Sequence, residues 1–159
     1  LISAEHRDKV EQYVADAIED GATRLTGGKR PDDPELANGF YYPPTILDHC
    51  ASDMRCVREE SFGPVLTVET FTGATDRERE DAAVSVANDT IYGLAGAVWA
   101  GDQDKAKAVA RQIRTGMVDV NGGGFNPMAP FGGFKQSGRG REAGKYGLEE
   151  FLEIKSMQL

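Results

Sequence analysis

Hydrophobic residues near the start of the chain recur at helical spacing, with polar residues between them. Such spacing places them on one face, so it predicts an amphipathic helix between residues 3 and 21. Ser3 is the expected N-cap, and Gly21 is the expected left-handed residue that ends the helix. The apolar stripe consists of Val10, Tyr13, Val14, Ala17 and Ile18.

The next part of the chain is irregular up to residue 63. Residues 27–39 are rich in Gly, Pro, Asp and Asn, which predicts a surface loop. A short strand is expected over residues 44–48.

From residue 64 onward, apolar segments of strand length alternate with helical patterns. Strands are expected over residues 64–71, 94–99 and 117–121, each apolar on both faces as buried parallel strands are. The first helix between them carries a capping box, and Asp102 caps the second, which Gly116 ends. The capping box consists of Thr75 and Glu78.

Strands that alternate with helices pair in parallel through right-handed crossovers. The β-α-β-α-β order therefore predicts an α/β fold with three layers, a mostly parallel sheet with helices on both faces.

The last forty residues have a different character. Residues 122–135 hold five glycines and two prolines, which excludes regular structure. Residues 151–159 alternate apolar and polar side chains, so we expect an edge strand that needs a partner.

Composition and charge narrow the class of protein. The 159 residues are 40% hydrophobic and 28% charged, with a net charge of −8. An acidic chain repels phosphate backbones, so nucleic acid is not an expected partner. The apolar runs are too short for a bilayer, and no basic start precedes an apolar core; we therefore expect no membrane span and no signal peptide.

The cysteines and histidines indicate neither a metal site nor a redox pair. Cys50 and Cys56 match no CxxC or zinc spacing, and His6 and His49 stand apart from each other. We expect no metal and two buried, inert thiols, since neither cysteine has a histidine at recognisable spacing. A reducing, cytoplasmic setting is the simplest interpretation.

Residues 59–65 (EESFGPV) form the first candidate site, directly before a predicted strand. The carboxylate of Glu60 can accept hydrogen bonds from a ribose diol, and the ring of Phe62 can pack on a flat heterocycle. The alternative is a solvated acidic pair with Phe62 in the core.

Two glycine-rich segments are further candidates. Residues 130–142 (PFGGFKQSGRGRE) lack a complete phosphate-loop pattern. We therefore expect their glycines to allow close packing of the backbone, and Lys135, Arg139 and Arg141 to form ion pairs with nearby acidic side chains. Residues 121–125 (NGGGF) follow a predicted strand, and a loop at the end of a strand can reach a binding site. Asn121 can donate a hydrogen bond from its side-chain amide, and Phe125 can form a wall of an apolar pocket. The alternative is that the segment is a plain flexible turn.

Three segments together resemble the aldehyde dehydrogenase superfamily over nearly the whole chain. Residues 59–65 look like its EExFGPV signature, residues 87–94 (ANDTIYGL) like its AN-x-x-x-YGL turn, and residues 130–142 like its PFGG-x-K-x-SG-x-GRE segment. Gly147 and Leu148, then Phe151 and Lys155, resemble its closing segment. The order of these segments along the chain and the spacing of their residues also resemble those of the family.

The resemblance implies oxidation of an aldehyde to a carboxylate through a thiohemiacetal and a thioester, with hydride passing to NAD or NADP. It implies that Glu60 holds the nicotinamide-side ribose and that Phe62 contacts the nicotinamide region. The loop over residues 122–128 is expected to border the aldehyde pocket, and Asn121 with the turn at residues 131–133 to shape it. The pocket residues are then Asn121, Gly123, Phe125 and Phe131.

The resemblance also implies what lies outside the chain. Residues 1–150 match part of the family's catalytic domain near its C-terminal end, and residues 151–159 match a strand of the region that makes homo-oligomers. The cysteine nucleophile, the general-base glutamate, the oxyanion-hole asparagine and the N-terminal dinucleotide-binding domain lie upstream. No catalytic residue is therefore assigned here, and the chain alone is expected to be inactive. The alternative is a free-standing interaction module that binds a partner through its terminal strand.

Overall fold

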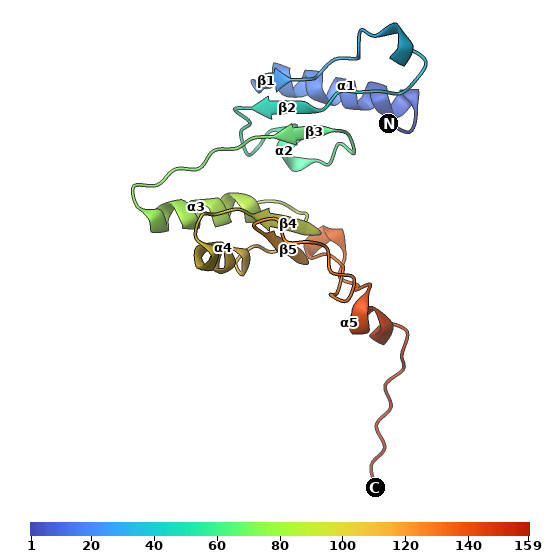
Figure 1. Ribbon diagram of the computed structural model, residues 1–159, viewed down its shortest axis with the longest axis vertical. Coiled ribbons are helices and arrows are strands. Elements are labelled where there is room, and N and C mark those ends of the chain that lie inside the picture. Colours follow the sequence, from blue (N-terminus) through green and yellow to red (C-terminus); the bar gives the residue numbers. More distant parts are fainter. The chain divides into compact units, whose positions relative to one another are not determined.

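The computed structural model describes all 159 residues. They divide into two compact units, unit 1 over Leu1–Phe71 and unit 2 over Thr72–Leu159. Each unit has its own small sheet with helices (Figure 1). The units are described separately below.

Unit 1 begins with the predicted amphipathic helix α1 (Ala4–Glu19). Ser3 is extended and its hydroxyl accepts from the His6 amide at 3.0 Å, so it caps the helix. Gly21 lies just beyond the end with φ 110°, where a side chain would be strained. Ile18, the last residue of the predicted stripe, is 41% exposed, because it belongs to the final turn beside solvent.

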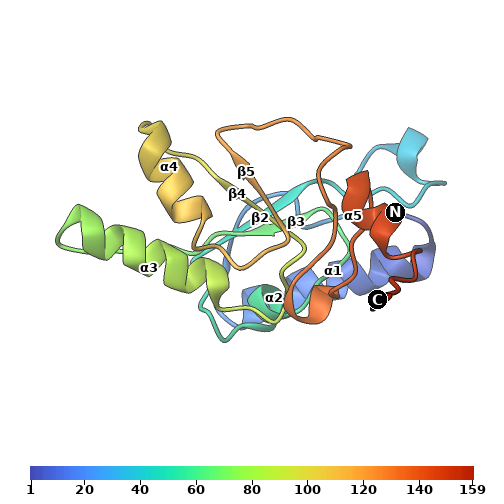
Figure 2. The same ribbon diagram turned by 90° about the horizontal axis from the view of Figure 1, so that it is seen from below.

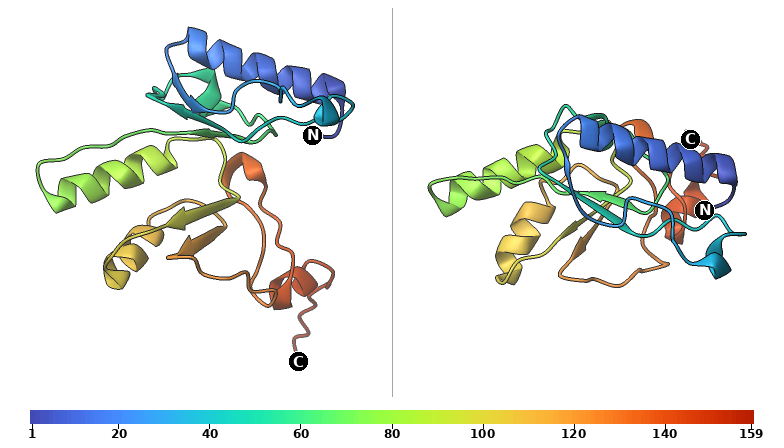
Figure 3. Two further views of the ribbon diagram at one scale, coloured as in Figure 1. Left: turned by 45° about the horizontal axis from the view of Figure 1, so that its top comes forward. Right: turned by 90° about the horizontal axis from the view of Figure 1, so that it is seen from above.

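The sheet of unit 1 has three strands, β1 (Thr23–Thr26), β2 (Thr45–Asp48) and β3 (Val65–Thr67). β1 is antiparallel to the central β2, and β3 is parallel to it. Helix α1 lies along one face of this sheet (Figure 3). The short 3₁₀ helix η1 (Pro34–Leu36) and helix α2 (Arg55–Arg58) complete the unit.

The core of unit 1 lies between α1 and β2. Val10 and Val14 from the helix meet Leu47 from the strand, and Leu47 has no exposed surface. Complete burial of a leucine side chain contributes about 1.5–3 kcal/mol. Cys50 and Cys56 belong to the same cluster.

Unit 2 contains helix α3 (Asp76–Asn88), strand β4 (Ala95–Val98), helix α4 (Gln103–Ala110) and strand β5 (Met117–Val120). The capping box of Thr75 and Glu78 and the N-cap Asp102 are both present. β4 and β5 are parallel in register, and α4 packs against both of them (Figure 2). α4 ends at Ala110, six residues before Gly116, and an irregular turn fills the interval.

The glycine-rich segment after β5 is irregular, as predicted, except for the 3₁₀ helix η2 (Lys135–Ser137). Helix α5 (Gly144–Glu149) follows it, and no strand forms after it. In Figure 1 the residues beyond α5 extend away from that helix.

The chain thus has the predicted α/β character, although its sheets are smaller than the strand pattern suggested. β3 pairs with β2 rather than with β4, so the three strands predicted to follow one another form two separate sheets. β3 also covers only three of the eight residues expected. No helix of the structure combines the length and hydrophobicity that a bilayer crossing requires.

Candidate functional site

The loop that carries Glu60 and Phe62 is fixed to the body of unit 1 at three points. The Tyr13 hydroxyl of α1 donates to the Glu59 carbonyl oxygen at 2.6 Å. The Thr45 amide of β2 donates to the Pro64 carbonyl oxygen at 2.8 Å. Between them, Gly63 lies so close to α1 that a Cβ atom would be 2.7 Å from both methyl groups of Val10. Glycine is therefore required at position 63.

Glu59 and Glu60 have different roles in this loop. The Glu59 carboxylate accepts from Arg55 Nε at 2.8 Å, four residues earlier. The exposed Glu60 carboxylate makes no hydrogen bond or ion pair within the chain. Only Glu60 is therefore available to a ligand.

Phe62 is held in an unusual conformation. Its φ is 53°, in the left-handed region that a bulky residue rarely adopts, and its ring is 72% exposed. The Ser61 hydroxyl accepts from the Gly63 amide at 3.2 Å and closes a tight turn around it. Phe62 is thus outside the core, which disagrees with the alternative interpretation of this motif. Strain and exposure of this kind are typical of residues that bind a ligand.

In unit 2, Gly93 joins the two other sequence motifs. Its amide donates to the Ser137 hydroxyl at 3.0 Å, and its carbonyl oxygen accepts from the amides of Gly116 and Phe134 at 3.0 and 2.8 Å. A Cβ atom on Gly93 would be 2.7 Å from the Arg114 carbonyl oxygen. Residues 87–94 and 130–142 therefore meet at one junction.

The basic residues of the glycine-rich segment bind carbonyl groups and not the acids that we expected. Lys135 Nζ donates to the carbonyl oxygens of Asn88 and Thr90, both at 3.0 Å. Arg141 Nη1 donates to Gly133 O at 2.9 Å, and its guanidinium lies 5.4 Å from the centre of the Phe134 ring. Two of these acceptors belong to the segment over residues 87–94 and one to the glycine-rich segment itself.

Asn121 uses its side chain to fix the ends of two strands together. Its Nδ2 donates to the Ala100 carbonyl oxygen at 3.0 Å, and its Oδ1 accepts from the Ala100 amide at 2.9 Å. Its φ of 51° turns the chain out of β5, a conformation that asparagine tolerates better than most residues. Asn121 therefore positions the loop that follows, and both ends of its amide are occupied by backbone.

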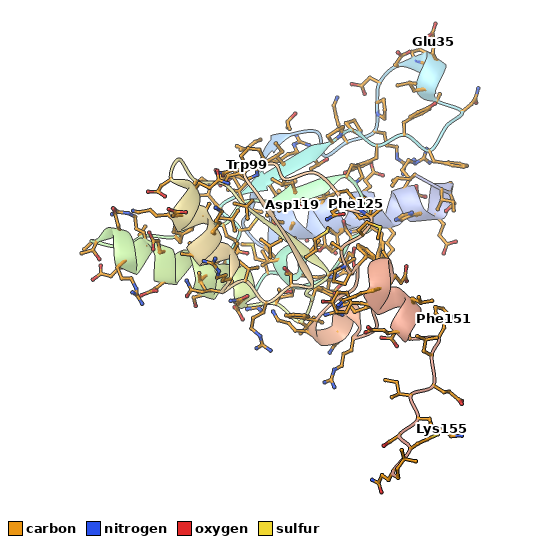
Figure 4. The ribbon with its side chains drawn as sticks, turned by 60° about the horizontal axis from the view of Figure 1, so that its bottom comes forward. Glu35, Trp99, Asp119, Phe125, Phe151 and Lys155 are labelled. Atoms are coloured by element: carbon orange, nitrogen blue, oxygen red, sulfur yellow. The ribbon has the colours of Figure 1, made fainter.

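Phe125 and Phe131, from the two ends of this loop, line one cavity of about 180 Å³. Asp119 of β5 lines it too, together with Met117, Asn126 and Pro130. Gly123 does not; its amide donates to Val120 O at 3.2 Å and forms the turn after the strand. Two of the four predicted pocket residues, Phe125 and Phe131, thus line the same cavity. The other two, Asn121 and Gly123, form the turn that follows β5. Figure 4 labels Asp119 and Phe125 of unit 2 among the side chains.

Sequence reasoning missed Asp119. The sequence did contain a signal that could have identified it: β5 (MVDV) is apolar except for this one acidic residue between two valines. A carboxylate at such a position needs a reason, because burial without a partner is costly.

The two cysteines are free thiols buried in unit 1. Burial, with a smaller contribution from neighbouring Cys50, raises the pKa of the Cys56 thiol to about 12. Cys56 is therefore a neutral thiol at neutral pH and a poor nucleophile. No group of three or more histidine, cysteine, aspartate or glutamate side chains is arranged to hold a metal ion.

Comparison with known proteins identifies the family. The Aldehyde dehydrogenase family profile matches residues 1–157. The chain belongs to this family. Betaine aldehyde dehydrogenase of Bacillus subtilis (strain 168) is 60% identical over 158 residues, and a putative aldehyde dehydrogenase of Staphylococcus aureus (strain USA300) is 45% identical.

Solved aldehyde dehydrogenase structures agree with the fold of the chain. Betaine aldehyde dehydrogenase from Staphylococcus aureus, 49% identical, aligns with a TM-score of 0.89 over 98% of the chain and 30% of its own length. The Mycobacterium tuberculosis aldehyde dehydrogenase complexed with NAD+, 43% identical, aligns with a TM-score of 0.86 over 95% of the chain and 30% of its own length.

This aldehyde dehydrogenase chain spans only part of its relatives. It covers 31% of the Bacillus subtilis enzyme and 32% of the Staphylococcus aureus protein, while 98% and 99% of the chain itself are matched.

Proposed function

We propose that the chain is a part of an enzyme that oxidises a small aldehyde to a carboxylate with NAD. The single observation that carries the proposal is the anchored loop of unit 1, which presents a free Glu60 carboxylate and an exposed, left-handed Phe62. Because the chain belongs to the aldehyde dehydrogenase family, a nicotinamide dinucleotide is the ligand that we assign to this loop. NAD is proposed in preference to NADP because related structures are described as complexes with NAD+.

Glu60 and Phe62 suit one end of a dinucleotide. The carboxylate offers two oxygens to the two hydroxyls of a ribose, and charge-assisted bonds of this kind are among the stronger ones. The Phe62 ring lies two residues away and can cover the nicotinamide side. When bound, the nicotinamide accepts the hydride that leaves the substrate; this chain's part is to hold and orient it.

Unit 2 supplies one wall of the aldehyde pocket in this proposal. Phe125 and Phe131 provide its apolar surface, and Asn121 and Gly123 set the direction of the loop. Betaine aldehyde is the first substrate to test, since two similar proteins are named betaine aldehyde dehydrogenase.

The covalent chemistry is assigned to parts of the enzyme outside these 159 residues. The Cys56 thiol is neutral at neutral pH because its pKa is raised to about 12, and Cys50 is buried in the core of unit 1. The chain alone should therefore not turn over aldehyde.

The arrangement of the whole enzyme is part of the same proposal. Residues 1–150 would belong to a three-layer catalytic domain with a mostly parallel sheet, in a cytoplasmic enzyme. Residues 151–159 would pair with a strand of a second copy, since Phe151, Ile154 and Met157 are 84–97% exposed. An interaction module remains the competing function, because the same exposed segment would serve it.

Two assays test the proposal. The purified 159 residues and the product of the complete reading frame that contains them are each supplied with betaine aldehyde and NAD, and absorbance at the NADH band is followed. Turnover by the longer product alone is the expected result. Turnover by the 159 residues, or by neither protein, contradicts the proposal.

A substitution then tests the role of Glu60. Glu60→Gln removes the charge from hydrogen bonds worth about 1.5–3 kcal/mol, so the KM for NAD should rise about tenfold or more. Glu19→Gln, an exposed carboxylate at the end of α1, is the matched control and should leave the KM unchanged. Equal KM values for both variants would refute the assignment of Glu60.

A further inference from the structure

Four basic side chains meet at one cavity of unit 2. The cavity has a volume of about 310 Å³, and no aspartate or glutamate lines it. Its lining residues are Arg114, Gly133, Phe134, Lys135, Arg139 and Arg141. Because the chain as a whole has a net charge of −8, such a concentration of cations is a local feature that favours an anionic ligand.

Two of these cations have no partner within the chain. The side chains of Arg114 and Arg139 are exposed and make no hydrogen bond or ion pair there. The planar guanidinium group matches the oxygen atoms of a carboxylate or a phosphate and is weakly hydrated. Both arginines are therefore available to a ligand.

The other two cations are held in place by backbone groups. Lys135 Nζ donates to Asn88 O and Thr90 O, which uses two of the three donors of an ammonium group. Arg141 Nη1 donates to Gly133 O, and the bonds that it makes all lead to carbonyl oxygens. Neutral acceptors leave both charges in place, so the floor of the cavity is positive before any ligand binds. A preformed site loses little entropy on binding.

We propose that this cavity binds a phosphate group, with Arg114, Arg139 and Lys135 as its direct contacts. A phosphate group has three strong acceptor oxygens and a charge of about −1.5 to −2 at neutral pH, so three separate cations can bind it together. A single carboxylate has two oxygens and one charge, and it satisfies fewer of them. The proposal uses none of the residues assigned above to NAD or to the aldehyde, so its test is independent of the proposed function.

A small ligand suits this cavity better than a polyanion does. The volume of about 310 Å³ lies at the lower end of the roughly 300–1,000 Å³ of small-molecule sites. A nucleic acid would also meet the repulsion of the acidic chain as a whole. The ligand is therefore free phosphate or the phosphate group of a small molecule.

Calorimetric titration of the complete enzyme with inorganic phosphate tests the proposal. NAD is present at saturation, so that phosphate cannot occupy a dinucleotide site, and the ionic strength is kept constant with sodium chloride. One phosphate should bind per subunit, and sodium acetate should give no comparable heat. No binding of phosphate, or equal binding of acetate, would overturn the proposal.

Arginine variants then locate the bound phosphate. Arg114→Gln and Arg139→Gln should each weaken phosphate binding about fivefold, and the double variant about twenty-fivefold, as partly exposed charge pairs predict. Arg111→Gln is the matched control, because Arg111 is an exposed arginine at the end of α4 that does not line the cavity. It should bind phosphate as the wild type does. An unchanged affinity in the double variant would show that the phosphate binds elsewhere.

Glycerol 3-phosphate distinguishes the two sources of the phosphate group. Tighter binding of glycerol 3-phosphate than of inorganic phosphate supports a small phosphorylated molecule as the ligand. Equal or weaker binding supports free phosphate.

A chemical measurement does not depend on any variant being folded. Phenylglyoxal modifies accessible arginine side chains, and mass spectrometry of peptides gives the rate at each position. Inorganic phosphate should slow the modification of Arg114 and Arg139 and leave that of Arg111 unchanged. If phosphate protects neither of the two cavity arginines, the proposal is wrong.

Discussion

Asn121 connects the end of β5 to the end of β4, and its replacement has separable consequences. Asn121→Ala removes both hydrogen bonds to Ala100, each worth about 1 kcal/mol, so the loss is about 2 kcal/mol. Alanine must also adopt the left-handed φ of 51°, which adds about 1 kcal/mol. Asn121→Gly loses the same two bonds but adopts this φ without strain. We therefore expect the free energy of unfolding of unit 2 to fall by about 3 kcal/mol in the alanine variant and by about 2 kcal/mol in the glycine variant.

Trp99 provides a fluorescence probe for the stability of unit 2 in the Asn121 variants. It is the only tryptophan, directly precedes Ala100, and a Cβ atom on Gly122 would be 2.9 Å from its ring. Its emission during urea unfolding therefore reports unit 2. With a slope of about 1.5 kcal/mol per molar urea, the alanine midpoint should fall by about 2 M and the glycine midpoint by about two thirds as much. Equal midpoints for the wild type and Asn121→Ala would refute the argument, and a glycine variant less stable than the alanine variant would refute the strain contribution.

Two further predictions concern unit 1. Gly63→Ala should lower the free energy of unfolding by about 1–3 kcal/mol, because the new methyl group would be 2.7 Å from both Val10 methyl groups. Urea unfolding followed by circular dichroism measures this loss. Gly101→Ala is the control and should be neutral, because the space around Gly101 is open. Because the pKa of Cys56 is about 12 in the folded state and lower when unfolded, the unfolded chain loses this proton first, so stability should fall as pH rises from about 9 to 12. In Cys56→Ala this fall should be shallower, and an identical slope in both proteins would show that Cys56 does not contribute to it.

Local signals in the sequence predicted the three longest helices, α1, α3 and α4. Ser3, Thr75 and Asp102 each accept hydrogen bonds from the amides that a cap should satisfy. Such caps depend on residues two or three positions apart, so they can be read from the sequence. Helices α2 and α5 were missed, since neither has a capping side chain and α5 follows Ala143, which has a positive φ.

Strand pairing was harder to predict than strand position. The residues of β4 and β5 were located almost correctly, but β3 pairs with β2, which precedes it by about twenty residues. β1 was missed altogether, because its four exposed residues carry no alternating apolar pattern. Pairing depends on contacts between distant residues, about which periodicity contains no information.

The candidate site was predicted by motif and corrected by geometry. Glu60 and Phe62 came from a resemblance, and the structure adds that their loop is anchored by Tyr13 of α1. Asp119 came from the structure alone, because a single acid in a strand is usually solvated. Whether these residues bind cofactor and substrate stays a prediction.

The loop over residues 122–130 is fastened at both ends, by Asn121 on one side and by the Phe131–Glu142 bridge on the other. Most of its residues are exposed. Substitutions within it should therefore be nearly free of cost to folding. If the loop borders the aldehyde pocket as proposed, its exposed residues can change in evolution, and the substrate preference with them, while the residues that fasten it stay the same. For enzyme engineering, it is the segment to diversify, with Asn121 and Phe131 kept as its fixed borders.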